Sequence, residues 1–309
     1  MNYNTKTKLD SLNKVLSIVL VIAIVFLGVA IAFNLGDKGK PVSEEDVVSE
    51  DVAVIDEFKA GTYGGVNFAS LDDVVNYYKE CYDYTKTLTA PYVDADGNTQ
   101  NYYKLIGDEK LEIKNLLVEG NSNSMLDNLV PGIAGGLFSG NLIGLSPSGG
   151  RGPETDTRVD GTFDCKTSQI TPDDILAANV VDNGDGTITL TLQPKAVILS
   201  MPGEDSQGLF FNSLGDISSV VESISVLSFS SGTIQDNFVV DYKGGTGTVK
   251  INTATKEIVE ADYAMNVHID VKHANVAVLK DKSASLDIVY SNHYPAADDY
   301  MAGLGVKKG

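Results

Sequence analysis

The feature that most constrains this chain is one long alternating stretch, Val259–Val271 (VEADYAMNVHIDV). Its odd-numbered positions are all apolar, and its even-numbered positions are polar except for Ala264. A period of two predicts a β-strand with one buried face and one wet face. At about 3.3 Å per residue, such a strand is roughly 40 Å long. An apolar face of that length needs cover from helices, from a second sheet or from a ligand.

Further strands are predicted on both sides of this one, at 187–192, 238–242, 246–251 and 283–290. Short turn-forming stretches separate them, and sequential strands with short turns pair antiparallel, as a meander. Long one-sided strands twist and curl. We therefore expect an α+β fold in which a curved antiparallel sheet, a half-barrel meander, packs over a few helices.

Three segments are candidates for those helices. Ser70–Leu88 has an apolar stripe, with Ser70 as the expected N-cap. The sequence TPDD at 171–174 predicts a short helix that ends near Asn179. Residues 128–150 carry no charge and are rich in Gly and Pro. They are interpreted as part of a core helix over 125–138 with a loop after it, or alternatively as a lid over an apolar cavity.

The N-terminal part of the chain predicts a location at the cell membrane. Residues 15–33 are apolar and uncharged, about the length that spans a bilayer. Lysines before this run and acidic residues after it predict a cytoplasmic N-terminus and an extracytoplasmic C-terminal domain. A cleaved signal peptide is the alternative. The expected organisation is therefore a cytoplasmic basic segment (1–14), a transmembrane anchor or uncleaved signal (15–35), an acidic stalk (36–54) and one extracytoplasmic domain (55–309).

Charge excludes one class of partner. The chain has 42 acidic residues against 23 basic ones, a net charge of −19. Such a surface repels phosphate backbones, so a nucleic-acid partner is not expected.

The two cysteines, Cys81 and Cys165, leave two alternatives open. Outside the cytoplasm they could form one disulfide that closes a long loop. Otherwise both are buried free thiols, a common state of cysteine.

The pattern of elements resembles a known family. The stretches that carry the resemblance are TPDD at 171–174, DNGDGTITLTL at 182–192 and GTVKINTATKEIVEADYAMNVHIDV at 247–271. Together they are similar to the half-barrel of lipoprotein localisation factors and mycobacterial lipid-binding lipoproteins, and to exported proteins of Gram-positive bacteria. The resemblance covers about half the chain and implies an apolar ligand held in the cup of a sheet. This chain lacks the lipid-modified cysteine of the lipid carriers.

Motifs of catalysis and cofactor binding are missing from the sequence. The acidic turns at 94–98 and 182–187 do not have the ligand spacing of a calcium loop and are interpreted as turns. His268 and His293 would lie near each other if their strands formed a hairpin around 278–282, but two histidines alone do not make a metal site. We therefore expect no enzyme activity, no cofactor and no metal site.

The predicted function is a membrane-anchored extracytoplasmic module that binds lipid or another apolar ligand. The side chains expected to line or gate its site are Leu129, Ile133, Leu137, Phe138, Tyr263 and Met265. The alternative is an envelope structural or protein-interaction domain with a filled core and no ligand. A hydrolase would need a convergent polar cluster in a cleft.

Overall fold

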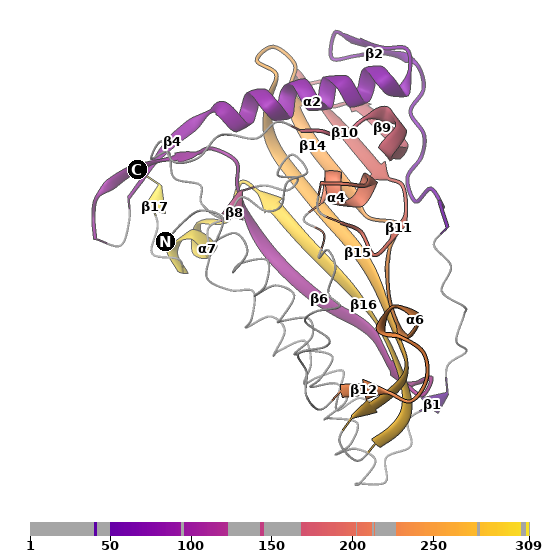
Figure 1. The fold of residues 1–309 in the computed structure, drawn as a ribbon. Helices are drawn as coiled ribbons and strands as arrows, with labels where there is room; N and C mark the ends of the chain where they lie inside the picture. Colours follow the sequence, from indigo (N-terminus) through magenta and orange to yellow (C-terminus); the bar gives the residue numbers. More distant parts are fainter. Residues whose placement is uncertain are drawn as a thin grey trace.

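A large antiparallel sheet dominates the computed structural model of this protein (Figure 1). The structure describes residues 40–41, 50–93, 96–122, 143–144, 168–201, 203–211, 213, 227–276, 279–303 and 307–308. Across the sheet the strands follow the order β1-β7-β6-β16-β15-β14-β10-β9, and β8, β11, β12 and β13 pair beside this path. The predicted antiparallel sheet with few helices is confirmed.

The main sheet is built from strands of very unequal length. Its members are β1 (Lys40–Pro41), β6 (Ile106–Val118), β7 (Asn121–Ser122), β8 (Ile143–Gly144), β9 (Ile175–Asp182), β10 (Thr187–Pro194), β11 (Val197–Ile198), β12 (Leu227–Phe229), β13 (Phe238–Tyr242), β14 (Thr246–Asn252), β15 (Glu257–Val276) and β16 (Leu279–Tyr294). Two smaller sheets pair β2 (Gly61–Tyr63) with β3 (Val66–Phe68), and β4 (Thr89–Val93) with both β5 (Thr99–Tyr103) and β17 (Lys307–Lys308).

Strand β15 is the longest strand of this sheet. It contains the whole predicted alternating strand and is longer, with 20 residues. On one side it pairs with β16; on the other it pairs in turn with β14, β13 and β12. The predicted meander is therefore wrong at one step, because β13 does not pair with β14. Both strands lie along the same edge of β15, end to end.

The strand next to β16 comes from far away in the sequence. β6 pairs with β16 from Val118 opposite Ala284 to Asp108 opposite His293. The stretch 111–119, whose alternation is ambiguous between helix and strand, thus lies inside the sheet.

The sheet is open and uncurled, so the expected half-barrel is not formed. A sheet cups or closes when many strands add side by side with a regular stagger. Here β12, β13 and β14 share one edge of β15 instead, which lengthens the sheet along its strands without adding width.

The helix α2 (Leu71–Thr87) confirms the prediction for 70–88. Ser70 is its N-cap and accepts a hydrogen bond from the N–H of Asp73, whose carboxylate accepts from the N–H of Ser70. This capping box satisfies two backbone donors at the helix start. Near its other end, Thr85 Oγ1 accepts from Ile258 N at 2.8 Å, which fixes α2 to the beginning of β15.

The other helices in the described part of the chain are short: α4 (Ser206–Phe210), α6 (Ile234–Asn237) and α7 (Asp298–Gly303). The helix predicted from TPDD is wrong beyond its first turn. Pro172–Asp174 form a single 3-10 turn, and the chain enters β9 at Ile175. Its capping box is present, but burial of alternate β9 side chains in the sheet decides the conformation that follows.

Two predicted turns are confirmed. β4 and β5 form a hairpin around Gly97, and β9 and β10 form one around 183–186. At the second turn, the carboxylates of Asp182 and Asp185 accept the N–H groups of Gly184 and Thr187. Backbone donors therefore use these carboxylates, as in an Asx turn.

Among the described residues no helix is long and apolar enough to cross a membrane. The longest, α2, has 17 residues and carries charges along its length. This finding overturns the predicted single-pass membrane localisation. The predicted basic segment 1–14 and anchor 15–35 lie outside the described residues.

Parts of the predicted acidic stalk contact the sheet. Lys40–Pro41 form β1 against β7. The backbone of Val52 and of Val54 exchanges hydrogen bonds with the side chain of Gln193, each 2.8 Å long. Residues 50–54 therefore lie against β10.

Candidate functional site

The candidate site is the apolar face of β15 and β16, where two of the predicted ligand-lining residues lie. Tyr263 and Met265 occupy neighbouring core-facing positions of β15 and are buried. The other four predicted lining residues, Leu129, Ile133, Leu137 and Phe138, lie outside the described residues. The structure therefore places part of the predicted site in the core beneath α2 and α4.

Aromatic rings pack around Tyr263. Its ring centroid lies 5.6 Å from that of Phe210 in α4, and Phe210 lies 5.9 Å from Tyr78 in α2. Gly247 on β14 makes this approach possible, since a Cβ there would lie 2.6 Å from Phe210 Cζ and 2.7 Å from Tyr263 Cε1. This end of the apolar face is closely packed.

Inside this cluster, two tyrosine hydroxyls meet. Tyr78 Oη and Tyr263 Oη are 2.6 Å apart, and both side chains are fully buried. Burial raises the pKa of each phenol, with the neighbouring hydroxyl adding to the rise at Tyr78 and opposing it at Tyr263. Both groups therefore stay neutral. One hydroxyl donates to the other, which leaves one O–H without an acceptor among the described residues.

Asn292 is the unexpected member of the apolar face. It lies on β16 directly opposite Tyr263 and in line with the core residues Tyr290 and Tyr294. Only 1% of it is exposed, yet neither Oδ1 nor Nδ2 has a hydrogen-bond partner. On its other side is β6, where a Cβ at Gly107 would lie 1.7 Å from Asn292 Oδ1. A buried amide without partners costs about 1–3 kcal/mol, so Asn292 is a stability cost at this position.

Cys81 lies on the buried face of α2 as a free thiol. Burial raises its pKa to about 12, so the thiolate, the reactive form, is not populated near neutral pH. Cys165 lies outside the described residues.

The opposite, polar face carries all three histidines, each beside an aspartate of the facing strand. The Nδ1–Oδ1 distances are 2.6 Å for His268–Asp287, 2.8 Å for His273–Asp281 and 2.6 Å for His293–Asp262. The expectation that His268 and His293 lie near each other is wrong. The turn between β15 and β16 falls around 277–278, so that each faces an aspartate instead.

One member of each pair has a shifted pKa. Burial works against the charged form of His293, but the hydrogen bond and charge of Asp262, with the charges of Asp108 and Glu260, outweigh it and raise the pKa of this imidazole. Burial likewise opposes the charge of Asp287, yet its hydrogen bonds with His268 and Asn115 lower its pKa. The charged forms of His293 and of Asp287 are therefore favoured.

A row of polar groups crosses three strands at His268. Asp241 on β13 and Asp287 on β16 both face it. Asp241 is fully buried and lies 3.0 Å from Nζ of Lys243, but neither of its oxygens accepts a hydrogen bond. Lys243 therefore balances the charge of this buried carboxylate, which lies beside His268.

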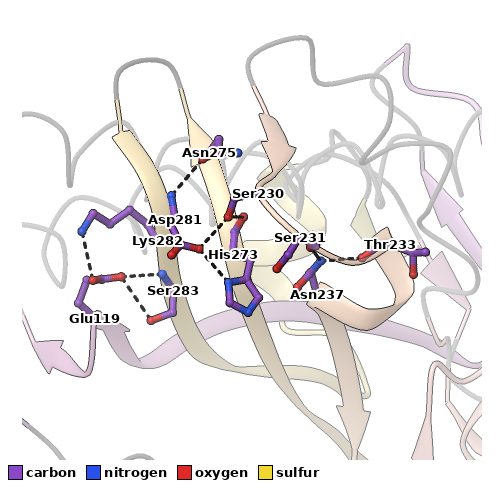
Figure 2. A network of polar contacts seen from close by, with 10 residues as sticks. All are labelled: Glu119, Ser230, Ser231, Thr233, Asn237, His273, Asn275, Asp281, Lys282 and Ser283. Carbon is purple, nitrogen blue, oxygen red and sulfur yellow. Dashed lines mark hydrogen bonds and ion pairs between the residues drawn. The ribbon is translucent and has the colours of Figure 1, made fainter.

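A second polar network lies at the far end of the β15–β16 hairpin (Figure 2). Asp281 Oδ1 accepts from Ser230 Oγ at 2.7 Å and lies 2.8 Å from His273 Nδ1. Hydrogen bonds with His273 and Ser230 lower the pKa of Asp281. In a nucleophilic triad the histidine connects serine and aspartate; here the aspartate connects the other two. The network therefore joins β12 to the hairpin rather than activating Ser230.

Glu119 joins β6 to the same hairpin end. Its Oε1 accepts from Ser283 N at 2.7 Å, and its Oε2 lies 3.1 Å from Nζ of Lys282 (Figure 2). Glu119, His273 and Asp281 all have positive φ angles between 52° and 54°. Positive φ is uncommon outside glycine, although Asp and His adopt it more readily than most residues, and these hydrogen bonds stabilise it here.

Within the described ranges, no three His, Cys, Asp or Glu side chains gather in a way that could hold a metal ion.

The prediction missed Asn292, although the sequence contains a signal for it. If the alternation of β16 is continued past Tyr290, Asn292 falls on the apolar side between two tyrosines.

Comparisons of this chain with protein-family models, with curated proteins and with solved structures give no match. The resemblance to lipid-binding half-barrels therefore stays a prediction.

Proposed function

We propose that this chain is a non-enzymatic binding module that holds an apolar ligand, such as a lipid, against the apolar face of β15, β16 and β6. The observation that carries the proposal is that this face is much longer than α2, the longest of the described helices. β15 extends over roughly 66 Å, whereas the 17 residues of α2 extend over about 25 Å.

The arrangement of the elements supports this comparison. In Figure 1, α2 lies across one end of the sheet, and β6, β15 and β16 continue far beyond it. Val267, Ile269 and Val271, on the apolar side of that continuation, are at most 2% exposed. Among the described helices, α2 lies over only one end of this face, and a ligand bound along the rest of it would contact these side chains.

The test is native mass spectrometry of the purified full chain, followed by organic extraction and lipid analysis. The proposal predicts a lipid at fixed stoichiometry, either co-purified or taken up on incubation with mixed lipids. A chain that carries no lipid, and whose mass is unchanged by every lipid offered, would refute it.

A second candidate function is protein interaction through the polar face, with a filled core. The specific observation in its favour is the row of charged side chains around His268, which includes the buried Asp241 and its ion pair with Lys243. A photo-crosslinking residue at Val289, on the polar face between the histidine pairs, would then capture a defined partner in cells. The same residue at Tyr84, exposed on α2, would not.

A further inference from the structure

We infer that Asn292 is the polar contact of the bound ligand and that the ligand carries an uncharged hydrogen-bonding group, such as the ester or hydroxyl of a monoacylglycerol. This inference rests on the proposed function and adds to it the chemistry of the ligand's head. The observation behind it is that both polar atoms of Asn292 are buried without a partner on an otherwise apolar face.

The surroundings of Asn292 are built to accommodate its side chain. Gly107, beside it on β6, has no side chain, and any Cβ there would collide with the amide at 1.7 Å. A glycine at this place leaves room for Asn292 but offers it no hydrogen bond. Tyr290 and Tyr294, two positions away on either side along β16, are buried and place aromatic surface next to the amide.

The groups with unused hydrogen-bonding capacity lie on the same side of adjacent strands. Asn292 offers one acceptor and two donors, and the Tyr78–Tyr263 pair offers one further O–H. Asn292 and Tyr263 face each other across β15 and β16. A ligand group that both accepts and donates hydrogen bonds would satisfy donors and acceptors that otherwise cost stability.

The environment favours an uncharged group. Burial of a charge without a partner is far more costly than burial of a hydrogen-bonded neutral group. Burial raises the pKa of both phenols in this core, as expected where a charge would be poorly solvated. A monoacylglycerol is therefore preferred over an ionised fatty acid of the same chain length.

The experiment measures the binding of monoolein and of oleate at pH 8 to the full chain and to two variants. Asn292→Leu keeps a similar size but removes the amide. Ile251→Leu, buried on β14 and outside the face of β15, β16 and β6, conserves volume and removes no polar group. Asn292→Ala is used in place of the leucine variant if the latter does not fold, as judged by circular dichroism.

We expect wild type and Ile251→Leu to bind monoolein equally and to prefer it over oleate. Asn292→Leu should bind monoolein about tenfold more weakly, the effect of losing one or two neutral hydrogen bonds. Its thermal stability without ligand should equal or exceed that of wild type, because the amide without partners is gone.

Three other outcomes separate the inference about Asn292 from the proposed function. If wild type binds monoolein and Asn292→Leu binds it as tightly, the inference about Asn292 is overturned and the proposed function stands. If wild type binds oleate more tightly than monoolein, the inference that the ligand carries an uncharged head group is overturned. If no apolar ligand binds wild type at all, the proposed function itself fails.

Discussion

Gly247 offers the sharpest test of how the core beneath α2 and α4 is packed. A methyl group at this position would lie 2.6–2.8 Å from three ring atoms of Phe210 and Tyr263. Optimal carbon–carbon contacts are at about 3.5–4.0 Å, so each contact is short by roughly 0.7–1.4 Å. Both rings are buried and held by other rings, so they cannot move aside without cost.

Overpacking of a well-packed core costs about 1–3 kcal/mol. A Gly→Ala change also reduces the backbone freedom of the unfolded chain, which by itself stabilises the fold by about 0.4–1 kcal/mol. We therefore expect Gly247→Ala to destabilise the fold by about 2 kcal/mol, measured by urea unfolding. With a slope of about 2 kcal/mol per molar urea, the midpoint falls by about 1 M.

The control is Gly61→Ala, where the nearest heavy atom to a new Cβ is 3.5 Å away and the φ angle is not positive. Its midpoint should stay close to that of wild type. In a Phe210→Leu background, which removes two of the three short contacts, Gly247→Ala should cost less than it does alone. If Gly247→Ala unfolds within 0.2 M of wild type, about 0.4 kcal/mol at this slope, the packing argument is refuted.

Three further predictions concern other parts of the fold. Tyr78→Phe and Tyr263→Phe should each lower the free energy of unfolding by about 1–3 kcal/mol, because each leaves the other buried hydroxyl unpaired. The double variant should lose less than the sum of the two single losses. Strict additivity in this double-mutant cycle would contradict the hydrogen bond between the two hydroxyls. Because the pKa of His293 is raised, its pair with Asp262 stabilises the fold fully below the ordinary imidazole pKa of about 6.5, and this stabilisation is lost as pH rises through the pKa of the folded state. The melting temperature of wild type should therefore gain from a change of pH 8 to pH 6, and His293→Gln should reduce that gain. An unchanged gain in the variant would contradict the role of this pair. With the other cysteine replaced by serine, Cys81 should react with a thiol reagent only at the rate of unfolding, whereas fast labelling of the native chain would show that its burial is wrong.

The sequence predicts those elements whose pattern is local. The alternation over 259–271 identifies the middle of β15, and the cap at Ser70 with its apolar stripe identifies α2. The same kind of signal misleads at Thr171. Its capping box forms, but the residues after Asp174 gain more by adding a strand to the sheet than by continuing a helix.

Pairings between distant strands are not visible in these patterns. Nothing in the periodicity of β6 states that it lies beside β16, and the bulges that end the regular pairing of β15 after Val271 set where its turn falls. A shift of a few residues in that turn places His268 opposite Asp287 instead of near His293. For the candidate site, the sequence identifies Tyr263 and Met265 as core-facing but misses Asn292, whose significance depends on the absence of partners in three dimensions.

The pairing of β6 with β16 has a consequence for the order in which the chain can fold during its synthesis. The hydrogen bond from Ser291 Oγ to Lys110 O joins residues 181 positions apart. At about 5–20 residues per second, the ribosome adds that length in roughly 10–35 s. Throughout this interval β6 has been made but has no strand to pair with on its β16 side. We expect the middle of the sheet to assemble only once β16 has left the ribosome. Nascent chains truncated before β16 should therefore expose an unpaired strand edge to chaperones and proteases.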